Sequence, residues 1–180
     1  MERVEHIRNH PLYRASQQRI DEMEQNRIFC CHDVNHSLDV ARILYILVLE
    51  QGLSYKKDII YATALLHDIG RGLEYKEQVS HHEAGAGLAK EILKDCGFDE
   101  NEIAMIAEAI AGHHTGNAYS ESTNDNQTVV SMADGMVNNE ASFFKELFYK
   151  ADKLSRNCFD CKANAECYWK QEKRNLWIRY

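Results

Sequence analysis

The stretch YKKDIIYATALLHDI, residues 55–69, decides the fold. It follows Ser54, a residue type that caps helix N-termini, and it becomes apolar on every side, as a helix buried at the centre of a protein does. Gly70, directly after it, predicts the end of the helix. On both sides of this stretch apolar residues recur with a period of 3.6 rather than 2, so we predict an all-α, single-domain helical bundle.

The other periodic segments define the remaining elements of the bundle. Residues 33–51 present one apolar face and end at Gly52. Two further helices begin where a Ser or an Asp precedes a Glu by three residues, which is the spacing of a capping box. The predicted elements are a helical segment at 1–29 broken by Pro11, helices at 33–51, 81–95 (capped by Ser80 and Glu83), 100–113 (capped by Asp99 and Glu102), 128–137 and 140–155, a polar loop at 115–127, and a short cysteine-bearing tail at 157–180.

The composition is that of one globular domain spanning residues 1–180. Apolar residues make up 44% and charged residues 27%, with 9 Gly and 1 Pro, which excludes a disordered or a collagen-like chain. The longest apolar run, residues 43–49, is too short to cross a membrane, and the opening MERVEHIRNH is too polar for a signal peptide. We therefore expect a cytoplasmic protein without a membrane partner. The net charge of −7 also argues against nucleic acid as a partner.

Several ionisable side chains lie on the predicted buried faces of their helices. A single buried histidine is usually a core residue bonded to a carbonyl group, but several imidazoles together with two carboxylates are costly to bury without a shared partner. A divalent metal is such a partner, and mixed nitrogen and oxygen ligands favour iron or manganese, with zinc or magnesium as alternatives. The residues concerned are His36, His67, Asp68, His81, His113, His114 and Asp152.

Three motifs carry a resemblance to a known family: HSLDVARI at 36–43, LLHDIG at 65–70 and YKADKLSR at 149–156. They resemble the HD-domain superfamily of all-helical, metal-dependent phosphohydrolases, which is named for an adjacent His-Asp pair. In this resemblance His36, His67, Asp68 and Asp152 match the basic metal site. His81 in SHHEAGAG and the pair His113 and His114 in IAGHHTG match the larger set that holds two metals in some branches, including those that cleave cyclic dinucleotides.

The chain departs from that cyclic-dinucleotide branch at two points. The branch has a Gly-Tyr-Pro signature after its paired histidines, whereas this chain reads TGNAYSES at 115–122. The branch also has a metal-binding Glu four residues before the first His, where this chain has His32. His32 either coordinates metal, because residues four apart share a helical face, or is a solvated residue at the helix start. Between His81 and His82, the apolar face favours His81.

The resemblance implies hydrolysis of a phosphoester in a nucleotide or another small phosphorylated substrate, by water activated on one or two metals. Asp68 would orient that water. Arg71 would contact phosphate, unless it is a surface arginine at a helix end, and Lys153 is a weaker candidate for substrate binding. The loop at 115–127 is placed to act as a lid. Two alternatives stay open: a di-iron oxygenase of the same superfamily, and a non-enzymatic metal or redox sensor.

The tail carries a second group of candidate ligands. Cys158, Cys161 and Cys167 have the spacing C-x2-C-x5-C, and three thiolates so spaced can hold zinc or an iron–sulfur cluster. A closed site needs a fourth ligand, which the sequence does not identify; the alternative is that these are ordinary reduced thiols. The candidates for the fourth ligand are Cys30, Cys31 and Cys96, and the aromatic residues Trp169, Trp177 and Tyr180 predict that the tail packs on the helical core.

Overall fold

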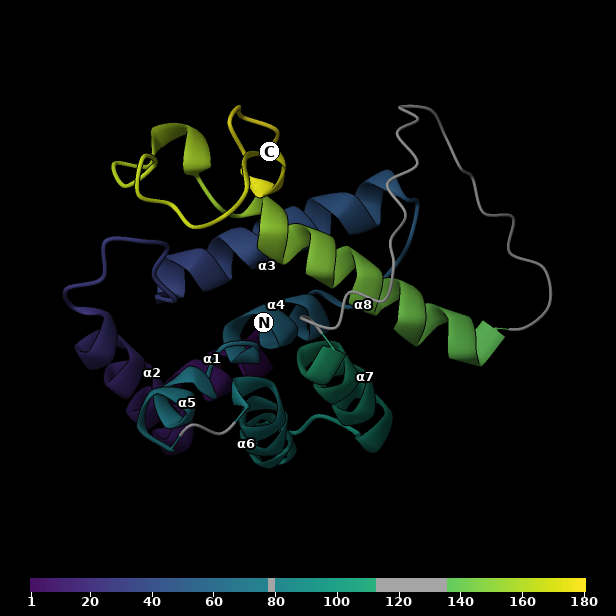
Figure 1. The fold of residues 1–180 in the computed structure, drawn as a ribbon. Coiled ribbons are helices and arrows are strands. Elements are labelled where there is room, and N and C mark those ends of the chain that lie inside the picture. Colours follow the sequence, from purple (N-terminus) through teal and green to yellow (C-terminus); the bar gives the residue numbers. More distant parts are fainter. Residues whose placement is uncertain (78–79, 113–135) are drawn as a thin grey trace.

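The computed structural model describes residues 1–77, 80–112 and 136–180, and in these ranges it contains helices and no strand (Figure 1). The predicted all-α fold is therefore confirmed. In the same ranges, no helix is both long enough and apolar enough to cross a membrane. The helices are α1 (Glu2–Asn9), α2 (Pro11–Glu24), α3 (Val34–Glu50), α4 (Lys57–Leu66), α5 (Arg71–Glu77), α6 (His81–Asp95), α7 (Glu100–Gly112) and α8 (Met136–Leu154), followed by the short 3-10 turns η1 (Cys158–Asp160) and η2 (Gln171–Lys173).

Helix α4 lies at the centre of the bundle, as its all-round apolar sequence predicts. It packs against α1, α3, α6 and α7, and α8 packs in turn against α3 and α7. Figure 1 shows α3 and α8 side by side above α4, with α6 and α7 below it. The largest fully buried side chains of this core include Leu44, Leu47, Ile60, Leu66, Phe144 and Phe148.

The ends of α3 and α7 follow their sequence signals. Asp33 caps α3 by accepting a hydrogen bond from the backbone N–H of His36 at 2.9 Å, and Gly52 after the helix takes a φ of 66°, a conformation that glycine adopts without strain. At the start of α7, Asp99 accepts from the backbone N–H of Glu102 at 2.9 Å, and Glu102 accepts from that of Asp99 at 3.1 Å. This reciprocal pair is the predicted capping box.

Other predicted boundaries were wrong. Helix α4 begins at Lys57 with Lys56 as its N-cap rather than after Ser54, and Ser80 makes no side-chain cap on α6. Helix α5 was not predicted at all. Helix α8 is continuous from Met136, so the predicted break between 137 and 140 is absent. The rest of the predicted helix at 128–137 and the predicted loop at 115–127 lie outside the described residues.

Gly70 has a different role from the one predicted. A Cβ atom at this position would lie 2.1 Å from the carbonyl oxygen of His81 and 2.6 Å from the backbone nitrogen of Gly85. The missing side chain therefore lets the first turn of α6 pack directly on the turn that follows α4. This close approach brings His81 next to the pair His67 and Asp68, so Gly70 shapes the candidate site rather than merely ending a helix.

The tail is attached to the end of α8 mainly by polar contacts. The side-chain amide nitrogen of Asn175 lies within hydrogen-bonding distance of the carbonyl oxygens of Lys153, Leu154 and Arg156, at 2.8 to 3.2 Å. It thereby satisfies carbonyl groups that the helix end leaves unpaired. Trp177, which was expected to pack on the core, is 63% exposed.

Candidate metal centre

Four of the predicted metal ligands meet where three helices converge. His36 lies in the first turn of α3, His67 and Asp68 follow α4 directly, and Asp152 lies in the last turn of α8. The Nε2 atom of His36 is 3.3 Å from Nε2 of His67, 3.7 Å from Asp68 and 3.6 Å from Asp152. The Nε2 atom of His67 is 2.9 Å from Asp68 and 3.9 Å from Asp152. His36, His67 and Asp152 each offer a ligand atom within 4.8 Å of the others.

Hydrogen bonds determine which ring nitrogen of each imidazole carries its proton. Nδ1 of His67 donates to the carbonyl oxygen of Ala64 at 2.7 Å. The hydroxyl of Ser155 donates to the carbonyl oxygen of Asp152 at 2.7 Å, so it accepts from Nδ1 of His36 at 3.3 Å. In the neutral form each imidazole therefore has its lone pair on Nε2, and the two Nε2 atoms face each other. Burial lowers the pKa of His67, but Asp68 and Asp152 raise it above its ordinary value, which favours a cation at its Nε2.

The two Nε2 atoms are close enough to share a cation, either a proton or a metal ion, and a divalent metal fits the observed geometry. Metal–nitrogen bonds of about 2.0 to 2.1 Å place two nitrogen ligands of one tetrahedral ion about 3.4 Å apart. The two Nε2 atoms are 3.3 Å apart. The imidazole and carboxylate donors also suit iron, manganese or zinc. The residues present therefore fit the metal that the sequence predicted.

Two buried carboxylates give the centre its negative charge. Burial opposes the ionisation of Asp68, but His67 and Arg71 outweigh this effect and hold the pKa of Asp68 well below its ordinary value. Burial likewise opposes ionisation of Asp152, yet Lys153 and His67 hold its pKa well below the ordinary value. Both groups are therefore ionised at neutral pH, which favours a cation at this point.

Two basic side chains border the carboxylates. Nε of Arg71 donates to Oδ1 of Asp68 at 2.7 Å, and Nζ of Lys153 donates to Oδ2 of Asp152 at 2.5 Å. The Arg71 side chain is only 15% exposed, so the alternative of a surface arginine is wrong. Both residues lie where they could also reach a bound anion.

His81 is held beside this centre by Glu74. It is buried, and its Nδ1 donates to Oε1 of Glu74 at 2.6 Å, which is the carboxylate–imidazole arrangement that orients metal-binding histidines. His82 is more exposed, which agrees with the choice of His81. His113 and His114, the other predicted ligands, lie outside the described residues.

His32 is held by a carboxylate in the same way. Its Nδ1 donates to Glu24 at 2.5 Å, and Glu24 also accepts from the hydroxyl of Tyr75 at 2.5 Å. Burial opposes the ionisation of Glu24, but His32 and Tyr75 lower its pKa to about 2. The His32 ring lies edge-on to that of His36, with centroids 5.8 Å apart, and is 11% exposed. It is therefore not a solvated residue; its role as a ligand stays a prediction.

The orienting residues were missed by sequence reasoning, which searched for polar residues on apolar helix faces. Ser155 could have been found from its position one helical turn after Asp152. The other missed residues act from segments outside the predicted motifs, and they are Glu24, Glu74 and Tyr75.

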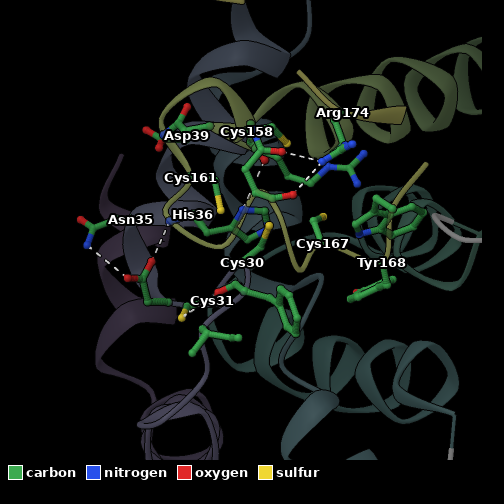
Figure 2. A pocket seen from close by; sticks show the side chains of 18 residues that line it. Cys30, Cys31, Asn35, His36, Asp39, Cys158, Cys161, Cys167, Tyr168 and Arg174 are labelled. Atoms are coloured by element: carbon green, nitrogen blue, oxygen red, sulfur yellow. Dashed lines mark hydrogen bonds between the residues drawn. The ribbon is translucent and has the colours of Figure 1, made fainter. Parts of the chain in front are cut away.

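A cavity of about 310 Å³ borders this centre on the side of the tail (Figure 2). His36 and Ser155 line it from the core. The cysteines Cys30, Cys31, Cys158, Cys161 and Cys167 also line it. Cys96, one of the predicted candidates for a fourth thiolate ligand, is buried at the end of α6 and is not among the lining residues.

Comparison with known proteins gives two kinds of relative. The chain is 37% identical, over the full length of both proteins, to an uncharacterized protein of Clostridium beijerinckii. It is also 35% identical over 85 residues to ribonuclease Y 1 of Pediococcus pentosaceus and 31% identical over 101 residues to ribonuclease Y of Mycoplasma mycoides. These matches cover 46% and 56% of this chain but only 14% and 21% of the two ribonucleases.

No solved structure matches the chain. A family model described as HD domain matches residues 33–157, a range that contains all four residues of the metal centre. The range covers well over half of the chain, and it begins at the cap of α3 and ends just after α8. The resemblance seen in the sequence motifs is therefore confirmed, and this protein belongs to the HD domain family.

Proposed function

We propose that this protein is a metal-dependent phosphohydrolase that cleaves a phosphoester of a nucleotide or another small phosphorylated substrate. The observation that carries the proposal is the pair of Nε2 atoms of His36 and His67, 3.3 Å apart with both Nδ1 protons engaged elsewhere. A buried pair of this kind beside two ionised carboxylates suits a divalent cation, and membership of the HD domain family supports hydrolysis as the chemistry.

The residues around the pair have distinct roles in the proposed reaction. His36, His67, Asp68 and Asp152 would hold the first metal, which when bound supplies Lewis acidity and lowers the pKa of water. Asp68 has a further role, because its ionised carboxylate can accept a proton from the attacking water and orient it. Ser155 and the carbonyl of Ala64 keep the two imidazoles in the tautomer that binds metal. A second metal would use Asp68 and His81 with His113 and His114.

Arg71 and Lys153 are suited to the substrate's phosphate. Each gives one N–H to a carboxylate of the centre and keeps further donors. The planar guanidinium of Arg71 matches two phosphate oxygens, whereas the ammonium of Lys153 is a point charge. Replacing Arg71 with Lys is therefore expected to raise KM more than it lowers kcat.

The similarity to ribonuclease Y supports a phosphodiester of nucleotides as the substrate class. The net charge of −7 opposes binding of long RNA, because polyanions are bound through excess positive charge. A small nucleotide substrate reconciles the two observations, and short RNA belongs in the test as a competing substrate.

The test is a metal analysis joined to an activity screen on anaerobically purified protein. Metal content is measured by mass spectrometry, and product release is measured from nucleoside monophosphates, cyclic dinucleotides and short RNA with manganese or ferrous iron present. We expect metal-dependent hydrolysis of a nucleotide, reduced at least about 100-fold in Asp152→Asn, which keeps the size of the side chain. The matched control is Asp39→Asn, a more exposed position on α3.

Three outcomes would overturn the proposal. Oxygen consumption without hydrolysis, by metal-loaded protein, would favour the di-iron oxygenase. Metal binding without turnover of any phosphoester or oxygen would favour a sensor. Full metal content and full activity in Asp152→Asn would place the chemistry outside this centre.

A further inference from the structure

The cavity between the tail and the core gathers cysteines from two distant parts of the sequence. Cys30 comes from the segment before α3, whereas Cys158, Cys161 and Cys167 come from the tail. Figure 2 shows the sulfur atoms of Cys30, Cys161 and Cys167 pointing into the same space beside His36. Cys158 lines the same cavity and is buried. The tail's three-cysteine motif thus acquires the fourth thiol that its sequence lacks.

The backbone of the tail orients its first two thiols together. Cys158 begins η1, and the backbone N–H of Cys161 donates to the carbonyl oxygen of Cys158. A 3-10 turn has three residues per turn, so residues three apart lie on the same side of it. The C-x2-C segment therefore presents both thiols to the cavity, as metal-binding C-x2-C segments do.

An aromatic contact next to the cysteines joins the two sides of the cavity. On the side of the core, Nε of Arg27 donates to the carbonyl oxygen of Cys30 at 2.8 Å and fixes the segment that carries this thiol. The ring of Phe29 packs edge-on against that of Tyr168, with centroids 5.5 Å apart. Because Phe29 precedes Cys30 and Tyr168 follows Cys167, this aromatic contact holds together the two chain segments that carry the first and last of these cysteines.

Cys31 differs from its neighbour. It is exposed, and its thiol donates to the carbonyl oxygen of Phe29. It lies at the edge of the cavity in Figure 2. Cys30 is more buried than Cys31 and its sulfur points toward the tail cysteines in Figure 2, so Cys30 is the better candidate for the fourth thiol.

The size of the cavity and the spacing of its thiols suit a multi-atom group better than a single ion. In a tetrahedral zinc site the sulfur atoms lie about 3.8 Å apart. Within the described residues, no three cysteine sulfur atoms lie within 4.8 Å of one another. The cavity of about 310 Å³ instead has the room of about ten liquid water molecules. Arg156 and Arg174 also line it, and so do Asp33 and Asp39, so these fixed charges balance one another.

From this arrangement we propose that Cys30, Cys158, Cys161 and Cys167 bind an iron–sulfur cluster that fastens the tail to the core beside the metal centre. Four cysteine thiolates are the ordinary ligand set of such clusters.

The experiment measures iron and acid-labile sulfide in the full-length protein, purified anaerobically and reconstituted with ferrous iron, ferric iron and sulfide. Acid-labile sulfide separates this site from the His/Asp centre, which can hold iron but not sulfide. We expect sulfide and the broad visible absorption of a cluster in the wild-type protein. Both should be lost in Cys30→Ser and Cys161→Ser and kept in Cys31→Ser, the adjacent control. They should also be kept in Asp152→Asn, which tests the proposed hydrolase centre separately.

Circular dichroism of each variant shows whether it folds. Because a cysteine variant can fail to fold, a second measurement tests the site in the wild-type protein alone. In the wild-type protein, alkylation by iodoacetamide should reach Cys31 and spare the four ligand thiols until the cluster is removed. Zinc bound without sulfide, and lost in the same variants, would overturn the cluster. Equal sulfide in Cys30→Ser and the wild type, or alkylation of all the tail thiols in reconstituted protein, would overturn the whole site.

Discussion

Ser155 determines the chemistry of His36 through a single hydroxyl group. Because its proton goes to the carbonyl oxygen of Asp152, the hydroxyl can only accept from Nδ1 of His36. This choice leaves Nε2 of His36 as the atom that meets Nε2 of His67. The metal-binding form of the imidazole is thus fixed by a residue that is not itself a ligand.

Replacing this hydroxyl is expected to weaken metal binding without unfolding the protein. Ser155→Ala should reduce metal affinity about 10- to 100-fold, as removal of orienting partners generally does. Competition with a chelating dye would measure the change. Ser37→Ala is the matched control, because Ser37 is also buried and its hydroxyl also donates to a backbone carbonyl, that of Asp33. Equal losses in both variants would show that Ser155 acts by packing alone.

Glu24 is the second residue whose hydrogen bonds can be tested singly. It accepts from the backbone N–H of His32 at 2.7 Å, from the ring of His32 and from Tyr75. In Glu24→Gln an NH2 group, which cannot accept a hydrogen bond, replaces one carboxylate oxygen. The substitution therefore leaves a buried donor without an acceptor. We expect a loss of about 1 to 3 kcal/mol in the free energy of unfolding in urea.

The control for this change is Glu22→Gln, which alters an exposed carboxylate on the same helix. It should change the free energy of unfolding by less than about 0.5 kcal/mol. If Glu24→Gln were as stable as Glu22→Gln, the cluster of Glu24, His32 and Tyr75 would contribute nothing to stability.

Residues of the centre that lie on apolar helix faces were predictable, and residues that act on them were not. His36, His67, Asp68 and Asp152 interrupt helical hydrophobic patterns, and the structure brings them together. Glu74 and Glu24 interrupt no such pattern, because a carboxylate on a mostly polar helix is an ordinary surface residue until the fold places a histidine beside it.

At the scale of elements, α3 and α7 were predictable from the sequence pattern, whereas α5 was not. The first two have caps and periodic apolar faces, and both were predicted to within about two residues. Helix α5 has seven residues, too few to show a period, and it exists because the turn after His67 and Asp68 packs against α2 and α6. Short elements of this kind are set by tertiary contacts that a sequence pattern does not contain.

The packing of α6 on Gly70 can be tested at two glycines, because replacing Gly70 by alanine should lower the free energy of unfolding and replacing Gly87 should raise it. Gly70→Ala places a Cβ against the backbone of His81 and Gly85, so the first turn of α6 must move. We expect a loss of about 2 to 4 kcal/mol in the free energy of unfolding, together with weaker metal binding. Gly87→Ala, in the same helix, meets no atom within 4 Å and should stabilise by about 0.5 to 1 kcal/mol.

Thermal and urea unfolding of the two variants would measure both effects. A stable Gly70→Ala variant with unchanged metal content would contradict the close approach of α6, whereas a destabilised Gly87→Ala variant would mean that the helix is strained at its exposed face.

At the scale of the whole molecule, one charge network ties the N-terminal helix to the bundle. Arg3 of α1 pairs with Asp58 of α4 and with Glu102 at the start of α7, and Lys56 also donates to Glu102 at 2.8 Å. The guanidinium of Arg3 lies 4.0 Å above the ring of Phe98. Three elements that are distant in sequence are therefore joined by one arginine, and their association depends on the charge of its partners.

This network predicts how stability falls in acid. The hydrogen bond from Arg3 outweighs burial and, with Lys56, lowers the pKa of Glu102 from its ordinary 4.5 to about 2. A lowered folded-state pKa means that the unfolded chain binds the proton more tightly, so the stabilisation is fully present above pH 4.5 and is lost as the pH falls toward 2. After screening by solvent we expect this group to contribute about 1 to 2 kcal/mol to the free energy of unfolding.

The variant Glu102→Gln tests this contribution, because glutamine can still accept at the helix cap but carries no charge. It should lower the free energy of unfolding at pH 7 by this amount and flatten its decline between pH 4.5 and 2, as measured by urea titrations. The control is Glu108→Gln, an exposed change on the same helix, which should leave the wild-type decline in place. A Glu102→Gln variant with the full wild-type decline would assign the acid sensitivity to the other buried carboxylates, of which Glu24 titrates in the same range.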